Sequence, residues 1–450
     1  HSVAVLEQGR REDPQTFEHN ELSMFARMYK QSGLQTSEDH NMALIQGATL
    51  GGSTVINNAI WMRADLDRVI PTWESAGAPV DRRAVEAGYE ELEQALHVSP
   101  VPPDLANRGT DVFLRGCDQI GIRGELLHNN RNHCIGCGWC NYGCRYNRKT
   151  SMLVTYIPWA ESRGVEFLDC CDDTRVLTRD GLAVGVEANR HGKRVAIEAE
   201  RVVVCAGAIG SSAVLLRSGV DLDGRVGQGL HVLGGTFVTG ETHEDIDGYD
   251  GIGLTSVAHA DPDYVIESYF APPVAFSLRL GGFFLSHFDR TSRYRHFVDG
   301  GVMVGTDPRN GRVRLDRKGN VRIEIKFGER DLSRLRRGLA TISRIYFAGG
   351  AVKVFPSSFK MIEFSHPDQV GEIEQMIREP DDLTLGSAHP QGGNPMSADR
   401  SRGVVDPEFR VHGFENLFVA DTSVWPENIW ANCQATAMAM SHYAATFVAA

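Results

Sequence analysis

No run of 18 consecutive apolar residues occurs in the 450 residues, so no segment is expected to cross a membrane as a helix. Basic residues are not in excess either: 46 Lys and Arg stand against 58 Asp and Glu, a net charge of −12. An acidic chain is poorly suited to nucleic acid, so we expect no such partner. The sequence also lacks internal repeats and low-complexity tracts, which excludes a solenoid protein.

Cysteine is too scarce and too unevenly placed for a disulfide framework. The nine Cys are an odd number, and four of them fall within residues 134–144, so we expect free thiols in a reducing compartment. No signal peptide is visible. We therefore expect a cytoplasmic protein, with association at the periphery of a membrane as an alternative. The length allows two or three domains with sizeable cores, and an oligomer stays open.

The C-terminal part carries the clearest chemical signal. The segment LGSAHPQGGNPM at 385–396 predicts a tight, Gly-rich loop that presents His389. Further on, an apolar run predicts a buried strand at 417–420 that ends at Asp421. A strand that ends at an acid and leads towards a helix N-terminus can bind an anion or a ribityl chain.

Asn432 follows in a second loop, before a small-residue helix that we expect from about Gln434. His389 and Asn432 would then reach one cleft from two loops. Oxidation of an alcohol by a flavin needs such a pair, because a base must take the hydroxyl proton and a partner must fix the oxygen.

The first residues predict a strand, Val3–Leu6, with Glu7 at its carboxyl end. In a dinucleotide-binding fold, an acid at the end of the second strand bonds a ribose hydroxyl, and a G-x-G-x-x-G turn lies ~20 residues before it. Only six residues precede Glu7 here, so the first strand, the phosphate loop and the first helix are absent from this sequence. Truncation, or supply by another segment, would explain this. Alone, Glu7 could equally be a strand-end carboxylate.

Strand-like and helical stretches alternate in the rest of the chain, which is typical of an α/β protein with a mostly parallel sheet. Residues 81–98 predict an amphipathic helix and 172–201 predict hairpins. In the second domain we expect strands at 275–288 and 321–327 and a helix at 331–350.

Residues 269–285, YFAPPVAFSLRLGGFFL, are unusually apolar and aromatic. They could line a substrate tunnel or touch lipid, or they could simply be the core of a sheet, which has the same composition. Cys205 lies in the apolar run RVVVCAG and is interpreted as a core residue.

Six segments together resemble the glucose–methanol–choline (GMC) oxidoreductase family, from one end of the chain to the other. Four of them are GATLGGSTVINNAIWMRA at 47–64, RVVVCAGAIGSSAVLLRSGV at 201–220, GRVGQGLHVLGG at 224–235 and GTDPRNGRVRLD at 305–316. The others are the two C-terminal segments with His389 and Asn432. Their order and spacing carry the resemblance. Among subfamilies, the chain looks most like bacterial long-chain or sterol-type alcohol oxidases and dehydrogenases.

The resemblance implies a Rossmann-like FAD-binding domain and a substrate domain built on an antiparallel sheet with helices. The expected division is 1–64, 150–238 and 376–450 for FAD, 65–149 for a helical, Cys-rich insertion, and 239–375 for the substrate. His389 would be the active-site base and Asn432 its partner, with hydride transfer to flavin N5. The residues expected to bind FAD are Glu7, Gly51, Gly52, Ser53, Asn57, Asn58, Val176, Ala206, Gly207, Asp421 and Asn432.

Cys134, Cys137, Cys140 and Cys144 have the spacing C-x2-C-x2-C-x3-C of the bacterial ferredoxin run, with Arg145 where Pro usually follows. We interpret them as ligands of an iron–sulfur cluster that takes electrons from the flavin. A structural zinc site is an alternative, although this short spacing would crowd a tetrahedral site. A metal-free loop is the other alternative.

We therefore expect a flavin-dependent enzyme that oxidises an alcohol, with an apolar alcohol favoured, and that passes electrons to a protein, a quinone or oxygen. A cluster would favour a dehydrogenase. The alternatives are an oxygen-using alcohol oxidase without a cluster and a flavin-free subunit with an assembly or electron-transfer role.

Overall fold

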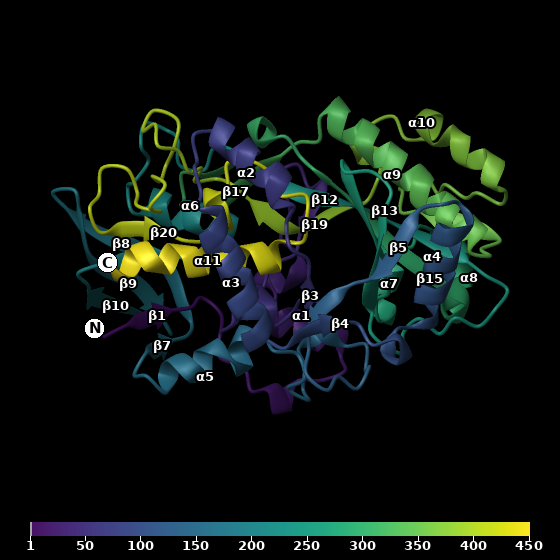
Figure 1. Ribbon diagram of the computed structural model, residues 1–450, viewed down its shortest axis with the longest axis horizontal. Helices are drawn as coiled ribbons and strands as arrows, with labels where there is room; N and C mark the ends of the chain where they lie inside the picture. The colour runs from purple at the N-terminus through teal and green to yellow at the C-terminus, as the bar shows by residue number, and fades with distance from the viewer. Residues whose placement is uncertain (1) are drawn as a thin grey trace.

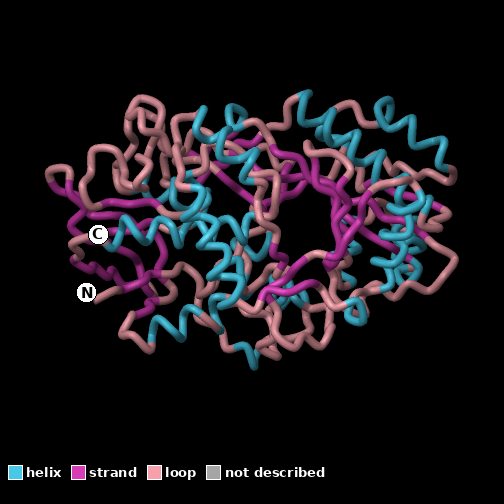
Figure 2. Tube along the Cα trace, in the orientation of Figure 1, coloured by secondary structure: helices cyan, strands magenta, loops and turns pink. Residues whose placement is uncertain are grey.

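The computed structural model describes residues 2–450 and has the mixed α/β architecture that the sequence predicts. The molecule is elongated, with both termini at one end (Figure 1). Small sheets lie at that end, and a large sheet flanked by helices lies at the other (Figure 2).

Two short pairs of parallel strands lie outside the large sheet. β1 (Ala4–Leu6) pairs with β7 (Glu166–Leu168), and β11 (Val202–Val204) pairs with β20 (Leu417–Val419). Helix α6 (Gly207–Arg217) begins just after β11. The carboxyl ends of β11 and β20 therefore open at the same edge.

Antiparallel hairpins form at 171–198, as the alternation of polar and apolar residues predicted. The three strands are β8 (Cys171–Arg179), β9 (Leu182–Arg190) and β10 (Lys193–Glu198). The predicted amphipathic helix is α3 (Arg82–Ala95), which Asp81 caps and which packs on α11 (Cys433–Ala449). Short elements complete this half: α1 (Glu21–Met28), β3 (Ile60–Trp61), α2 (Leu66–Ser75), β4 (Val98–Pro100), β6 (His128–Asn130) and α5 (Tyr156–Glu161).

An eight-stranded mixed sheet forms the other half, with the order β2-β19-β12-β15-β14-β13-β5 and β18 paired to β12. Its strands are β2 (Met42–Leu44), β5 (Arg123–Leu126), β12 (His231–Glu241), β13 (Leu254–His259), β14 (Tyr264–Tyr269), β15 (Phe297–Gly305), β18 (Lys353–Pro356) and β19 (Leu385–Gln391). The strands of this sheet come from the predicted FAD-binding domain, the predicted insertion and the predicted substrate domain. The domain boundaries remain a prediction.

Helices α4 (Arg108–Gln119) and α9 (Glu329–Ala348) cover one face of this sheet. Apolar residues of α9 such as Leu335 and Leu339 pack with Ile266 and Val302 of the sheet in one buried cluster. The opposite face carries Leu233, Met303 and other residues of a second cluster. A separate hairpin, β16 (Gly311–Leu315) and β17 (Val321–Ile325), and the short α10 (Ile373–Met376) lie outside the sheet.

His389 lies in a strand, which corrects the predicted tight loop. Residues 385–391 pair with β12 on one side and with β2 on the other, because the backbone N–H and C=O groups of both strands are available for pairing with this short segment. The turn begins only at Gly392 and Gly393, whose φ angles of 70° and 104° favour glycine.

The strand predicted at 275–288 is also wrong. This segment forms α7 (Pro273–Arg279) and α8 (Leu285–Ser292). Proline at the first helical position favours a helix start, and the Glu21 carboxylate accepts hydrogen bonds from the free N–H groups of Val274 (2.7 Å) and Ala275 (2.8 Å). Most of the apolar side chains expected in a sheet core are therefore outside it.

Candidate functional site

Ala206, Gly207 and Asp421 meet where β11 and β20 end. The Asp421 carboxylate accepts a hydrogen bond from Gly207 N at 2.9 Å and from Ser423 N at 2.8 Å, and Ser211 Oγ also donates to it. Burial raises the pKa of Asp421. Asp421 therefore caps α6, and part of its hydrogen-bonding capacity is used within the protein.

Cys205 is solvent-accessible, which corrects its interpretation as a core residue. The surrounding protein nevertheless desolvates the thiol and raises the pKa of Cys205 to about 12. The neighbouring Ala206 is exposed as well, so the carboxyl end of β11 is open to a ligand.

Glu7 and the 47–58 segment also lie together, because Leu50 N donates to Arg10 O at 3.1 Å. The Glu7 carboxylate accepts from Gly9 N at 2.7 Å, and burial raises the pKa of Glu7 to about 7 despite the nearby Lys30. Gly51 has φ of 95°, and a Cβ at Gly52 would meet no atom within 4 Å. Ser53 Oγ accepts from Gly47 N at 3.0 Å.

The other residues expected to bind FAD lie farther apart. Asn57 Nδ2 donates to Gln434 of α11, whereas the Asn58 carbonyl accepts from Arg131. Val176 is buried in β8, and its N–H donates to Ser218 Oγ at 2.8 Å. Asn57 is thus joined to the same helix terminus as Asn432, while the Val176 N–H already has a partner.

His389 and Asn432 meet at the N-terminus of α11, where Cys433 N donates to His389 Nδ1 at 3.4 Å. Burial lowers the pKa of His389 to about 4, and the positive end of a helix disfavours imidazolium further. The ring is therefore neutral at physiological pH, as a general base must be. The Cys433 contact favours the neutral tautomer with its proton on Nε2.

Glu267 of β14 is a third member of this group that sequence reasoning missed. Asn432 Nδ2 donates to Glu267 Oε1 at 2.8 Å, and burial raises the pKa of Glu267 to about 7. Among the described residues, Asn432 Oδ1 is buried without a hydrogen-bond partner. The available signal was the lone acid within the strand YVIESY at 264–269, because burial of an acid among apolar residues is unfavourable unless a partner compensates it.

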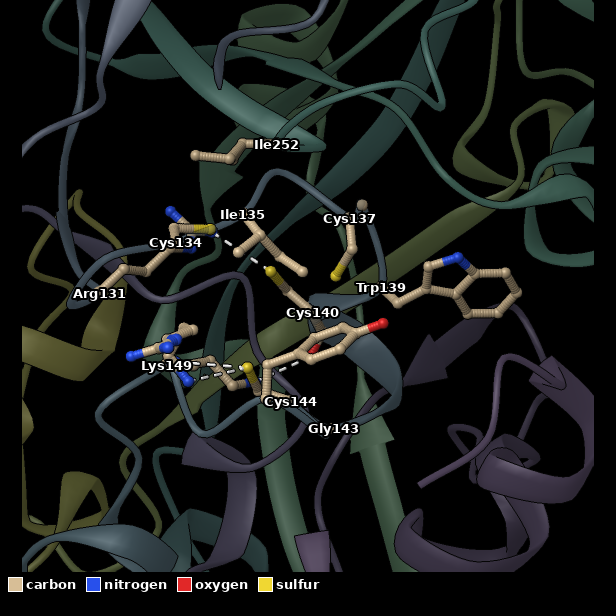
Figure 3. Close-up of a pocket in the computed structure, with 13 residues that line it drawn as sticks. Arg131, Cys134, Ile135, Cys137, Trp139, Cys140, Gly143, Cys144, Lys149 and Ile252 are labelled. Carbon is tan, nitrogen blue, oxygen red and sulfur yellow. Dashed lines mark hydrogen bonds between the residues drawn. The ribbon is translucent and has the colours of Figure 1, made fainter. Parts of the chain in front are cut away.

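The four cysteines of the ferredoxin-like run line one cavity, with Arg131, Trp139, Lys149 and Ile252 among its other walls (Figure 3). Backbone N–H groups donate to the sulfurs: Gly136 N to Cys134 Sγ (3.5 Å) and Arg148 N to Cys144 Sγ (3.2 Å). Such contacts stabilise thiolates and tune iron–sulfur clusters.

Two buried cations face the same cavity. Burial would raise the pKa of the Cys140 thiol, but Arg131 and Lys149 outweigh it, so the pKa of Cys140 is lowered. Arg131 Nη2 donates to Cys140 Sγ at 3.6 Å, whereas its Nε and Nη1 are buried and find no acceptor in residues 2–450. Unused donors of a buried guanidinium indicate an anionic occupant.

The cysteine loop is bonded directly to the predicted flavin turn. Four consecutive carbonyls, those of Val55, Ile56, Asn57 and Asn58, accept hydrogen bonds from the loop. The donors are Lys149 Nζ, which serves Val55 (2.7 Å) and Asn57 (2.8 Å), Asn141 Nδ2 and Arg131 Nη2. Burial lowers the pKa of Lys149 to about 8. The two candidate cofactor sites are therefore adjacent.

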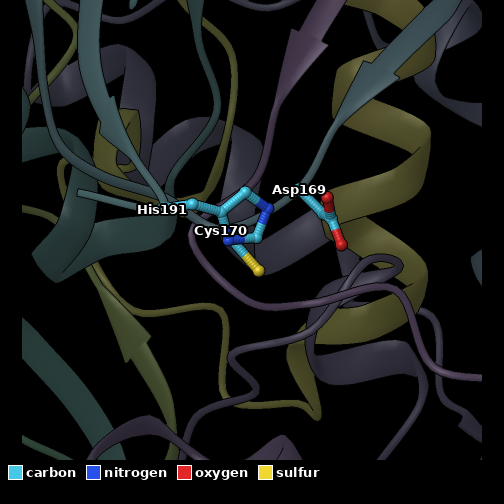
Figure 4. Close-up of side chains that lie close together, drawn as sticks. All are labelled: Asp169, Cys170 and His191. Atoms are coloured by element: carbon cyan, nitrogen blue, oxygen red, sulfur yellow. The ribbon is translucent and has the colours of Figure 1, made fainter. Parts of the chain in front are cut away.

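The spacing of the sulfurs disfavours a single zinc ion. Within residues 2–450, only Asp169, Cys170 and His191 bring three potential ligand atoms within 4.8 Å of one another (Figure 4). No three of the loop sulfurs do so, whereas a tetrahedral zinc with Zn–S bonds of ~2.3 Å would bring them closer than this.

The Asp169 group itself needs no metal. Asp169 Oδ2 accepts from Arg11 N at 3.0 Å, and Oδ1 accepts from Arg190 Nη2 at 3.1 Å. These two hydrogen bonds satisfy the Asp169 carboxylate without a metal ion.

Comparison with known proteins identifies the family. Two family models of GMC oxidoreductases match residues 25–233 and 307–441. The chain belongs to the GMC oxidoreductase family.

Relatives of this GMC oxidoreductase include an uncharacterised GMC-type oxidoreductase of Mycobacterium tuberculosis, 30% identical over 98% of the chain and 70% of the relative. A long-chain-alcohol oxidase of Arabidopsis thaliana is 24% identical over 96% of the chain and 62% of its own length. Among solved structures, a formate oxidase superposes with a TM-score of 0.74 at 16% identity, covering 99% of the chain and 93% of the oxidase. Pyridoxine 4-oxidase from Mesorbium loti gives 0.70 at 17%, covering 99% and 94%.

FAD is the cofactor that the family implies, and the residues present fit it. The exposed Cys205 and Ala206, the open backbone at Gly52 and the partly buried Glu7 carboxylate supply surface, close approach and an acceptor for a ribose hydroxyl. No helix within residues 2–450 is long and apolar enough to cross a membrane.

Proposed function

We propose that this GMC oxidoreductase is an FAD-dependent dehydrogenase that oxidises an apolar alcohol to a carbonyl compound. The observation that carries the proposal is the placement of His389, which accepts a bond from Cys433 N, beside the hydrogen-bonded pair of Asn432 and Glu267 at the N-terminus of α11. FAD, when bound, supplies the two-electron oxidant that takes the hydride from the carbinol carbon.

In this proposal His389 takes the hydroxyl proton at Nε2. Uptake there requires the ring hydrogen on Nδ1, so the 3.4 Å contact from Cys433 N must open when substrate binds. Asn432 fixes the hydroxyl oxygen and stabilises the developing alkoxide. Glu267 is a positioning residue, because its contact with Asn432 orients that amide. The alcohol loses one proton to the protein and one hydride to the cofactor, which balances the oxidation.

We further propose that Cys134, Cys137, Cys140 and Cys144 hold an iron–sulfur cluster. Support comes from their spacing, the shared cavity, the N–H···S contacts and the unused donors of Arg131. The bonds between the loop and residues 55–58 support a position for this proposed cluster next to the cofactor site. A cluster would relay electrons one at a time to a protein or quinone, which favours a dehydrogenase over an oxidase.

The first experiment mixes the purified protein, loaded with FAD, with a long-chain primary alcohol, a sterol or a sugar without oxygen. We expect the flavin absorbance to bleach with the long-chain alcohol or the sterol, and the matching carbonyl product to form. Bleaching by the sugar alone would contradict the apolar substrate class, and no bleaching by any alcohol would contradict the enzyme activity.

The second experiment measures iron and acid-labile sulfide in anaerobically purified protein, and electron paramagnetic resonance after reduction. We expect iron and sulfide in the wild type, their loss in Cys144→Ser, and their retention in Cys170→Ser, a control outside the loop. Zinc in place of iron, or no metal, would refute the cluster. If oxygen then restores the oxidised flavin at the turnover rate, the protein is an alcohol oxidase.

A further inference from the structure

The end of α7, the turn that follows it and the start of α8 present exposed, large apolar side chains. We define the apolar tip as Leu278, Phe283, Phe284, Leu285 and Phe288, whose side chains are each between 70% and 82% exposed. We propose that the apolar tip inserts into the surface of a lipid bilayer. A cluster of this kind marks an interaction site, since single exposed apolar residues are normal but contiguous ones are not.

Three backbone N–H groups at 283–288 are already hydrogen-bonded within this segment. Phe283 N donates to Ser286 Oγ at 3.0 Å, Ser286 N donates to Phe283 O at 3.2 Å, and Phe288 N donates to Phe284 O at 3.0 Å. His287 Nδ1 contacts Leu280 O at 3.1 Å. A segment that enters hydrocarbon must satisfy its polar backbone internally, because lipid tails offer no partners. A protein partner would impose no such requirement.

The base of the tip is held firmly by the sheet. Arg279 Nη2 bonds Asp299 Oδ2 at 2.8 Å, and its guanidinium lies 3.9 Å from the centre of the Phe237 ring. Arg290 Nη1 donates to Gly281 O at 3.0 Å, behind the tip. Helix α8 lies at the end of the molecule opposite the two termini (Figure 1). The tip is therefore a fixed projection, as shallow insertion requires.

The charges around the tip favour an apolar mode of insertion. Arg279 pairs with Asp299, Arg290 with Glu363 at 3.1 Å, and Arg293 with Glu241. Because these guanidinium groups are neutralised by acids, the surface offers little attraction to anionic head groups. We therefore expect binding to uncharged phosphatidylcholine bilayers, with weak dependence on salt.

The tip adjoins the face of the sheet that bears the candidate catalytic group. Glu267 and Tyr269 lie two residues apart on β14 and so share a face, and the Arg279 guanidinium is 5.0 Å from the centre of the Tyr269 ring. An apolar alcohol dissolved in lipid would meet the protein on this side. Lipid binding itself does not depend on the proposed activity, so its test can fail or succeed independently.

The test is co-sedimentation of the protein with sucrose-loaded vesicles of phosphatidylcholine, alone or mixed with phosphatidylserine. We expect the wild type to bind both vesicle types, and the double variant Phe284→Ser, Leu285→Ser to bind at least ten times more weakly. The matched control is Leu22→Ser, Leu34→Ser, which removes two exposed leucines elsewhere and should bind like the wild type. Circular dichroism checks the fold of both variants.

Phe284→Trp provides a second measurement, in a variant that keeps a large apolar side chain at the tip. Its indole fluorescence should be quenched by lipids that carry bromine on their acyl chains. The proposal is refuted if the wild type does not sediment with vesicles, if the serine variant binds like the wild type, or if the indole is not quenched. It is equally refuted if binding requires phosphatidylserine and disappears in salt, or if light scattering shows a dimer without lipid that the serine variant abolishes.

Discussion

Replacement of Glu267 by Gln should change how the stability of the protein depends on pH. Glu267 is 3% exposed, and burial raises the pKa of its carboxyl from 4.5 to about 7 in the folded protein. A raised carboxyl pKa favours the folded state below about pH 4.5, and this contribution is lost as the pH rises through about 7. At ~1.36 kcal/mol per pKa unit, a difference of about 2.5 units corresponds to roughly 3 kcal/mol.

The variant lacks this titration, while its amide oxygen can still accept the bond from Asn432. The stability of the wild type relative to Glu267→Gln should therefore fall by roughly 3 kcal/mol between pH 4.5 and pH 7.5. Urea unfolding of both proteins across this range measures the difference, and other titrating groups cancel in it. A constant difference, or a rise with pH, would refute a protonated, buried Glu267. Flavin reduction should change little in Glu267→Gln and fall in Glu267→Ala, because only the latter loses the contact with Asn432.

Three further predictions follow from single contacts. Asp421→Ala removes the cap of α6, so stability should fall by about 1–2 kcal/mol in thermal unfolding and FAD content should drop; unchanged values for both would contradict its placement. Lys149→Met removes the donor to Val55, Asn57 and Cys140, so iron retention should fall several-fold by metal analysis; full retention would show that the loop needs no such anchor. Asn432→Ala leaves the Glu267 carboxyl without its amide partner, so flavin reduction should slow, but less than in a His389 variant; the reverse order would exchange the two roles.

The sequence predicted the elements whose pattern is local. The helix at 82–95 and the hairpins at 171–198 followed from periodicity, because each presents one apolar face or strict alternation. The end of β20 at Val419, two residues before Asp421, and the start of α11 near Gln434 followed from the change of an apolar run into small residues.

Three shortcomings of the sequence-based predictions came from tertiary context. The apolar composition of 275–288 predicts a buried strand, because the sequence alone does not show whether other parts of the protein cover a segment. In the structure Glu21, which is distant in the sequence, caps the segment as a helix. His389 was placed in a loop because Gly and Pro surround it, but pairing with β2 and β12 draws it into a strand. Glu267 was missed because its partner, Asn432, lies in a distant segment that only the fold brings close.

In the proposed function, His389 takes the proton when this GMC oxidoreductase oxidises an alcohol. The most direct measurement compares wild type and His389→Ala, both loaded with FAD, in anaerobic stopped-flow reduction by a long-chain primary alcohol. We expect equal FAD content and reduction slowed by ~10²–10⁴-fold in the variant. Reduction at the wild-type rate with FAD bound would contradict it.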